Sequence, residues 1–313
     1  MKQITFTLVL MWAVAMVSCR KDKNDVDIKT YDQQQIQQYI SENGLTGMQR
    51  DLTSGDTTGM YYQILTPGKG ATVDYSTQVS LVYTMKSFDG KFSSVDTAVN
   101  HIYEYVGHLT LTNAYMTKGS MLGIINLLKN KGGRMRLLVP SHLAYGKSGY
   151  GTGSIDAANR VAGNQGIDYY INMVDNQDTY DEIAIKNYMT ANSLSESEFT
   201  KLPSGVRYKI TRAGVPSSTI TPTSSLEIQY TSYLLDGIAT ADSYNTATGS
   251  GVVVNLATDT RTGLREALLY SQPGCQMTIL IPSSKAYGTV TNITSNLPAN
   301  SCLRYDVNVL SVQ

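Results

Sequence analysis

The sequence predicts an α+β protein made of one unit written twice, each unit a twisted antiparallel β-sheet packed on one short α-helix and preceded by an amphipathic helix. Three observations predict this. Two long stretches of the chain repeat each other, each stretch alternates strand-like segments with a single helix-like one, and glycine (26 residues) and tyrosine (22 residues) are frequent. Glycine and tyrosine favour turn-rich β structure over a helical bundle. At roughly 150 residues a domain, 313 residues also suggest two domains.

Each copy opens with a helical pattern. Residues 32–46 and 181–195 align without a gap, and Tyr39 falls opposite Tyr188. Apolar residues recur at i, i+3 and i+4 in both stretches, which is the spacing of one face of an α-helix. Both patterns end near Asn or Gly, as helices commonly do. The sequence therefore predicts a short amphipathic helix ahead of each sheet.

The rest of each copy follows one order: a first strand, a long alternating strand, a hairpin turn at Asp-Gly, one short helix and two more strands. In the first copy the predicted elements are 61–65, 79–85, 122–128, 134–139 and 167–174, and in the second they are 207–211, 226–234, 263–270, 277–281 and 303–310. The first copy carries extra loop residues between Gly107 and Gly132 and between Gly146 and Asn164. Two copies are too few for a solenoid, so a tandem pair of domains is expected.

The N-terminus has the pattern of an export signal. Lys2 precedes an apolar run from Ile4 to Val17, about 14 residues, which is too short for a permanent membrane span. The run ends at Ser18-Cys19 and turns abruptly polar, so Cys19 is the predicted lipidation site of a bacterial lipoprotein. An ordinary signal peptide with an incidental cysteine is the alternative. The predicted organisation is signal 1–18, tether and helix 19–48, first domain 49–176, linker helix 177–202 and second domain 203–313.

Composition excludes several function classes. Lys plus Arg and Asp plus Glu number 25 each, so no broad basic surface for nucleic acid is expected. Three cysteines and three histidines show no zinc-ligand spacing, and we expect neither metal nor cofactor. Histidines in loops or on the surface are the default expectation. Cys275 and Cys302 either form a disulfide in an oxidising envelope or remain as two buried thiols.

Short motifs recur in both copies in the same order. The second copy reads Gly263-Leu264, Pro273-Gly274, Ile279-Leu280-Ile281-Pro282, Ala286-Tyr287-Gly288, Leu297-Pro298-Ala299-Asn300 and Leu303-Arg304-Tyr305-Asp306-Val307. The first copy offers Val82-Tyr83, Asp89-Gly90-Lys91-Phe92, Leu138-Val139-Pro140, Ala144-Tyr145-Gly146 and Tyr169. Tyrosines on alternating strands are usually core packing. Ala-Tyr-Gly twice, each time shortly after a proline, is better explained by a pocket.

In this order and spacing, the motifs resemble the FKBP-type peptidyl-prolyl cis-trans isomerase family over nearly all of the chain beyond the signal. The lipidation signal followed by helix-plus-FKBP units is similar to tandem-domain bacterial envelope lipoproteins. The resemblance implies isomerisation of prolyl peptide bonds in an aromatic pocket, with no covalent or metal chemistry. The implied partners are prolyl peptides and exported client proteins, with the membrane reached through the lipid anchor. The implied location is the cell envelope, at the outer membrane.

The resemblance also assigns site residues. In the first copy Tyr83 and Phe92 are pocket walls, Ile102 lies on the next strand, Leu122 is the floor, Tyr145 donates to a substrate carbonyl and Tyr169 closes the back. In the second, weaker copy the substrate-binding residues are Tyr230, Asp242, Leu264, Tyr287 and Tyr305. The first copy is expected to be the more active one.

Departures from the family pattern leave two functions open. The usual Phe-Asp pair after Asp-Gly is Phe92-Ser93 in the first copy and Ala241-Asp242 in the second, and neither copy has the floor tryptophan. The alternative to an isomerase is therefore a proline-peptide-binding or chaperone lipoprotein whose isomerase sites have decayed.

Overall fold

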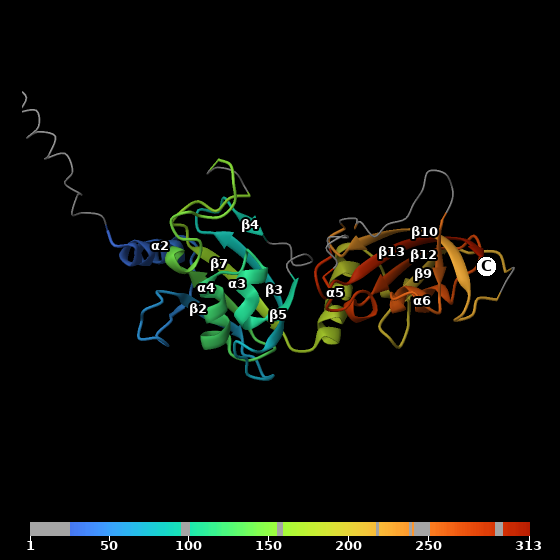
Figure 1. The fold of residues 1–313 in the computed structure, drawn as a ribbon, viewed down its shortest axis with the longest axis horizontal. Helices are drawn as coiled ribbons and strands as arrows, with labels where there is room; N and C mark the ends of the chain where they lie inside the picture. The colour runs from blue at the N-terminus through green and yellow to red at the C-terminus, as the bar shows by residue number, and fades with distance from the viewer. Residues whose placement is uncertain are drawn as a thin grey trace, which may run out of the picture.

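The computed structural model describes residues 26–94, 101–154, 159–216, 219–237, 240, 251–291 and 297–313. Over these residues the chain forms two antiparallel β-sheets, one in each half, and helix α5 begins the second half (Figure 1). The predicted α+β class with two antiparallel sheets is therefore confirmed. Cys19, Ala241 and Asp242 lie outside the described residues.

The elements of the first half are α2 (Ile28–Glu42), β1 (Gln49–Arg50), β2 (Tyr61–Thr66), β3 (Gln78–Ser87), β4 (Ser93–Ser94), β5 (His101–Tyr105), α3 (Leu109–Thr112), α4 (Lys118–Gly123), which continues as a π-helical turn (Ile124–Leu128), β6 (Arg134–Val139) and β7 (Ile167–Val174). Those of the second half are α5 (Gln177–Ala191), β8 (Thr200–Lys201), β9 (Arg207–Arg212), β10 (Ser225–Leu234), β11 (Val252–Asn255), α6 (Thr262–Leu268), β12 (Gln276–Ile281) and β13 (Leu303–Val312). Short 3-10 helices cover Val106–His108, Ser141–Leu143, Glu196–Glu198 and Ser283–Lys285.

The two sheets share one topology. The first runs β1-β2-β6-β7-β3-β4, with β5 also paired to β3, and the second runs β8-β9-β12-β13-β10-β11. The strands therefore match in sequence order, β2 with β9, β3 with β10, β5 with β11, β6 with β12 and β7 with β13. The short strands β1, β4, β5, β8 and β11 were not among the strands expected from periodicity, because two to five residues give too little alternation to recognise.

Each sheet is covered on both faces by helices. Along β6, Leu137 faces the large core cluster under α4, while its neighbour Leu138 packs with Ile36 and Tyr39 of α2. Along β12, Ile279 faces the cluster under α6 and Leu280 packs against α5. Successive side chains of a strand point to opposite faces, so a run of adjacent apolar residues needs cover on both sides. The helix ahead of each sheet provides the second layer.

In both halves a tyrosine hydroxyl joins the outer helix to the sheet. This hydroxyl donates a hydrogen bond in the first half and accepts one in the second. Tyr39 of α2 donates its hydroxyl to Asp168 at 2.9 Å, and Asp168 is held by Arg136 at 3.0 and 2.6 Å. At the matching place in β13, Arg304 donates to the hydroxyl of Tyr188 at 3.0 Å. The tyrosine hydroxyl therefore meets a carboxylate in the first half and a guanidinium in the second. Asp168 is buried, whereas Arg304 is about one-third exposed.

A buried carboxylate fixes each outer helix to the loop that follows β6 or β12. Asp32 accepts from the Ser141 hydroxyl at 2.6 Å, and its other oxygen lies 2.6 Å from Nδ1 of His142. Asp181 accepts both the backbone N–H and the hydroxyl of Ser283 at 2.7 and 2.6 Å. The helices begin four residues before the expected range, because the side chains of Asp27 and Asn176 cap their first turns. The two aspartates are therefore interior anchors and not the first helical residues.

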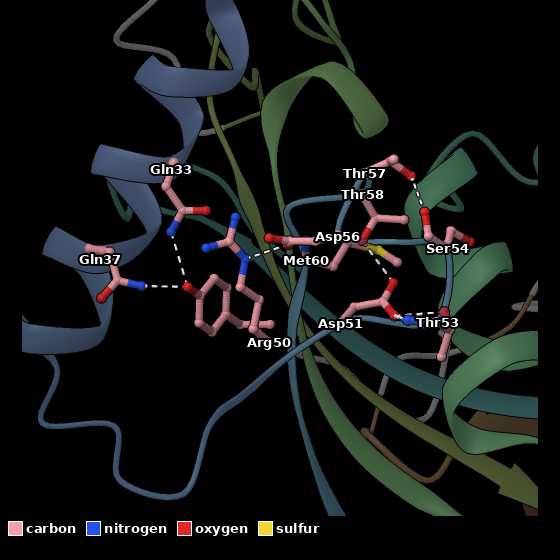
Figure 2. A network of polar contacts seen from close by, with 11 residues as sticks. Gln33, Gln37, Arg50, Asp51, Thr53, Ser54, Asp56, Thr57, Thr58 and Met60 are labelled. Carbon is pink, nitrogen blue, oxygen red and sulfur yellow. Dashed lines mark hydrogen bonds and ion pairs between the residues drawn. The ribbon is translucent and has the colours of Figure 1, made fainter.

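A loop present in the first half alone lies beside α2 (Figure 2). Residues 51–59 replace the shorter turn 202–205. Asp51 organises this loop by accepting from the Thr53 backbone and from the hydroxyls of Thr53 and Thr58, and Figure 2 shows these bonds together with Gln33 and Gln37 reaching from α2 to one tyrosine hydroxyl, that of Tyr61. The hydrogen bonds of Asp51 lower its pKa against the opposing effect of burial, so the carboxylate is ionised at neutral pH.

Cysteine and histidine positions complete the fold. Cys275 and Cys302 are free, buried and in different clusters, so the thiol alternative holds. His142 is tied to Asp32, and Nδ1 of His101 lies 3.1 Å from the backbone oxygen of Asn300 in the other half, so both histidines make structural contacts. Among the described residues no cluster of metal-ligating side chains is found, and no helix there is long and apolar enough to cross a membrane.

Candidate functional site

The predicted residues of the first half gather on the sheet face that α4 covers. Tyr83 comes from β3, Ile102 from β5 and Tyr169 from β7, while Phe92 follows the Asp-Gly turn and Tyr145 follows the 3-10 helix after β6. All five belong to or pack against one apolar cluster. Tyr83, Phe92, Ile102 and Tyr169 are only 2, 4, 7 and 0% exposed, so these four side chains are buried in this structure.

Ser120, and not Leu122, lies in the first half at the position that Leu264 has in the second half. Gly119 and Gly263 occupy matching places, because a side chain at either one would collide with the last residue of β6 or β12, Val139 or Ile281. The residue after each glycine is Ser120 in the first half and Leu264 in the second, and both are fully buried. Leu122 is half-buried at the edge of the cluster. The loop before α4 is longer than the loop before α6, so the two copies could not be aligned correctly at this helix from the sequence alone.

The two Ala-Tyr-Gly turns have the same backbone. Ala144 and Ala286 have ψ of −114° and −107°, and Gly146 and Gly288 have φ of 60° and 61°, a left-handed conformation that glycine adopts without strain. Each glycine carbonyl also accepts the backbone N–H of a later asparagine. Tyr145 and Tyr287 are therefore presented in the same way by both halves.

The three tyrosine hydroxyls of the first site are donors. Tyr145 donates to the Ala114 carbonyl at 3.0 Å, Tyr169 to the Tyr115 carbonyl at 2.7 Å, and Tyr83 to Oδ1 of Asn113 at 3.4 Å. Burial raises the pKa of all three hydroxyls well above the ordinary value for tyrosine. They therefore stay protonated at physiological pH and can donate to a carbonyl.

Two tyrosines that sequence reasoning missed lie against the first site. The ring of Tyr115 lies 5.7 Å from that of Phe92, and the ring of Tyr150 lies 5.6 Å from Tyr115 and 5.2 Å from Tyr145. Both come from the extra loop segments of the first copy, so no counterpart in the second copy marked them. The pairing of Tyr150 with Val161 across the glycine-rich loop brings its ring onto the site.

The second site contains an ion pair. Tyr230, Leu264 and Tyr305 are buried in one cluster, with Tyr287 packed against it. Arg261 donates to the Tyr230 hydroxyl at 2.8 Å and to both carboxylate oxygens of Asp259 at 3.0 and 2.6 Å. Its guanidinium also lies over the Tyr230 ring, 5.2 Å from the ring centre.

Arg261 remains charged in this setting. Burial acts against the charge, but the bonds to Asp259 and the neighbouring Tyr305 and Tyr230 outweigh it and raise the pKa of Arg261 above its ordinary value. Arg261 and its partner are only 12 and 13% exposed. The sequence signal was an acid and a base two residues apart just before a helix, a pattern too common to indicate a site.

Part of the second half is similar to a known protein family. Residues 217–310 match the family model of the FKBP-type peptidyl-prolyl cis-trans isomerase. This match identifies residues 217–310 as an FKBP-type segment. The FKBP segment contains β10 to α6, β12 and most of β13, and with them all five substrate-binding residues expected in the second copy. The first half has the same strand order as this FKBP unit.

Individual FKBP proteins are similar over parts of the chain. The FKBP-type peptidyl-prolyl cis-trans isomerase FkpA of Buchnera aphidicola is 29% identical over 131 residues, which cover 42% of this chain and 50% of the relative, so the chain spans about half the length of that relative. FkpA of Escherichia coli is 21% identical, covering 43% of this chain and 60% of its own, with a TM-score of 0.37. The three FKBP domains of wheat FKBP73 are 17% identical, covering 86% of this chain and 99% of theirs, with a TM-score of 0.32.

Proposed function

We propose that this protein is a peptidyl-prolyl cis-trans isomerase that assists the folding of exported proteins in a bacterial envelope. The observation that carries the proposal is the family match of residues 217–310, joined to the repetition of the same sheet and the same tyrosine positions in the first half. Prolyl peptides are the proposed substrates. The proposed site residues are those that the resemblance assigns, with Ser120 in place of Leu122.

Isomerisation of a prolyl bond requires only an apolar site that excludes water and fits the proline. Rotation about an X–Pro bond faces a barrier of about 18–20 kcal/mol that comes from amide resonance. Resonance makes the planar amide more polar than the twisted one. An apolar aromatic site therefore stabilises the twisted amide relative to the planar one, and only such selective stabilisation accelerates the reaction. A hydroxyl such as that of Tyr145 would orient the flanking carbonyl.

The first site is the better candidate for turnover. Among the described residues, the side chains that contact its tyrosines are uncharged, whereas the second site contains the Arg261–Asp259 pair against Tyr230. A fixed charge favours the polar planar amide, which opposes the twist. We therefore infer that the first half carries most of the isomerase activity and that the second half binds prolyl segments more than it turns them over.

Replacing Tyr145 by Phe tests the catalytic assignment. The change removes one hydrogen bond, worth roughly 0.5–1.5 kcal/mol, so the rate of cis-trans exchange in a prolyl peptide should fall by up to about tenfold. Phe92→Ala should lower the rate further, because it opens a wall of the site. NMR exchange spectroscopy on the full chain measures both.

Tyr170→Phe is the matched control, since Tyr170 is adjacent to Tyr169 on β7 but its side chain is 42% exposed. Its rate should equal that of the unchanged protein. Equal rates for Tyr145→Phe, Phe92→Ala and the control would remove the first site from the mechanism. No acceleration by any form of the protein would end the isomerase proposal.

One observation favours binding without turnover as a second candidate function. Ser120 provides no aromatic floor, and Tyr83, Phe92 and Tyr169 are buried in this structure. In that case a prolyl peptide would bind the protein, but the exchange rate of its prolyl bond would be unchanged. The same NMR experiment separates the two functions, because binding changes chemical shifts whether or not exchange accelerates.

We further propose that Cys19 anchors the protein to the envelope membrane by two acyl chains, which suffice for stable attachment. Cys19→Ala should then leave an uncleaved or soluble precursor. Detergent phase partitioning of cells expressing each form measures this. Equal partitioning of both forms into detergent after signal removal would contradict lipidation.

The proposed division into units 49–176 and 203–313 rests on their separate core clusters. Each half with its outer helix should therefore fold alone. Fragments 27–178 and 178–313 should each unfold in one cooperative transition when followed by circular dichroism. A fragment that unfolds cooperatively only when mixed with the other would argue for a single fused domain.

A further inference from the structure

The first half has an extra segment beside its site. The connection from β5 to α4 covers residues 106–117, twice the length of the connection 256–261 from β11 to α6 in the second half. The added length forms α3 and the turn 113–117. Leu109 of α3 is fully buried, so the segment is anchored in the core and held against the site.

The hydrogen bonds of the site end on this segment. The hydroxyls of Tyr83, Tyr145 and Tyr169 donate to three consecutive residues, Asn113, Ala114 and Tyr115. The acceptor for Tyr145 is a backbone carbonyl, the group that a peptide substrate would present to the same hydroxyl. The bond from Tyr83 is long at 3.4 Å, and Ala114 itself is exposed.

The ring of Tyr115 occupies the space beside the aromatic walls. It lies between Phe92 and Tyr150, 5.7 and 5.6 Å from their ring centres. Oδ1 of Asn113 fixes the turn by also accepting the Tyr115 backbone N–H at 2.9 Å. The segment thus makes both contacts that a bound prolyl peptide would make. It places a carbonyl against the Tyr145 hydroxyl and a ring against the aromatic side chains.

We propose that residues 113–115 are an internal occupant of the first site, which a prolyl peptide must displace in order to bind. This inference rests on the proposed isomerase function. In the closed state the segment blocks the Tyr145 donor and the surface of Phe92. The apparent affinity for peptide is then the intrinsic affinity multiplied by the open fraction, so releasing the segment tightens binding.

The experiment measures binding of a dansyl-labelled Ala-Leu-Pro-Phe peptide to the full chain by fluorescence anisotropy. Tyr115→Ala removes the occupying ring and should tighten binding by about three- to tenfold, equivalent to opening a site that is closed most of the time. Asn113→Ala removes the acceptor that fixes the turn and should act in the same direction. It serves as the second variant if Tyr115→Ala fails to fold.

Leu111→Ala is the matched control, because Leu111 lies in the same segment but is 81% exposed. Its affinity should stay within twofold of the unchanged protein. The gain in Tyr115→Ala should also disappear when Phe92→Ala is added, which assigns the gain to the first site and not to the second.

The outcomes separate the two proposals. Weaker or unchanged binding by Tyr115→Ala, with a prolyl peptide still preferred over its alanyl counterpart, overturns the internal occupant, makes Tyr115 a wall of the site and leaves the isomerase function standing. Equal binding of prolyl and alanyl peptides by every variant overturns both.

Discussion

Replacing Asp168 by Ala is expected to destabilise the first half by about 3–5 kcal/mol, the usual cost of removing one partner from a buried ion pair. Asp168 is 2% exposed and Arg136 is 14% exposed. The substitution leaves the guanidinium of Arg136 and the hydroxyl of Tyr39 without their acceptor, and α2 loses its docking bond to the sheet. Chemical denaturation measures the loss, and hydrogen exchange of the α2 amides shows whether that helix detaches first.

Asp306→Ala is the matched control for this prediction. Asp306 pairs with Arg304 at 2.7 Å, and Arg304 contacts the equivalent helix tyrosine, but both charges are about one-third exposed. Exposed pairs contribute about 1 kcal/mol or less. A loss for Asp168→Ala as small as that for Asp306→Ala would show that α2 is held by its apolar contacts alone.

Replacing Asp181 by Ala is expected to destabilise the second half by about 2–4 kcal/mol. The change removes the acceptor of the Ser283 backbone N–H and hydroxyl, and Ser283 is fully buried. A buried donor without an acceptor costs about 1–3 kcal/mol. Asp178→Ala is the control, since Asp178 on the same helix makes an exposed bond to Ser284. Its loss should be about 0.5 kcal/mol, from the helix-dipole contribution of a first-turn acid.

The effect of Asp181→Ala should depend on pH in a defined direction. Burial raises the pKa of Asp181 above its ordinary value of 3.8, against the opposing effect of its hydrogen bonds to Ser283 and Gln177. The folded state therefore binds the proton more tightly than the unfolded chain, so this contribution is complete below about pH 4 and declines as the pH rises through the folded-state pKa. Denaturation midpoints should show a larger loss at pH 4 than at pH 7, and a loss that grows with pH would refute the assignment.

Sequence reasoning recovered the elements whose pattern is local. Strands β6 and β7 were predicted with their observed ends, 134–139 and 167–174, because alternation and a flanking proline or glycine mark them. The outer helices were predicted in type but four residues late at their starts. Their first turns are polar, and the capping side chains of Asp27 and Asn176 fix the true starts.

The predicted site residues lie together where the two copies agree, and neighbouring residues were overlooked where the copies differ. Tyr83, Tyr145 and Tyr169 lie on one face of the sheet. They could be predicted because each has a tyrosine counterpart in the second copy. Leu122 was aligned with Leu264, whereas the structure has Ser120 at that position, because the inserted segment has nothing to align against. Tyr115 and Tyr150 were missed for the same reason. Arg261 was missed because an acid and a base close together before a helix are too common to indicate a site.

The sequence by itself determined that this protein is an α+β repeat whose second half carries FKBP motifs in order, because strand alternation, turn glycines and repetition are properties of neighbouring residues. Only the tertiary structure decided which charges meet. Asp168 and Arg304 hold equivalent helix tyrosines with opposite charge, and Arg261 enters the second site while Tyr115 fills the first. These contacts join residues far apart in the chain, and burial sets their strength, which no local pattern records.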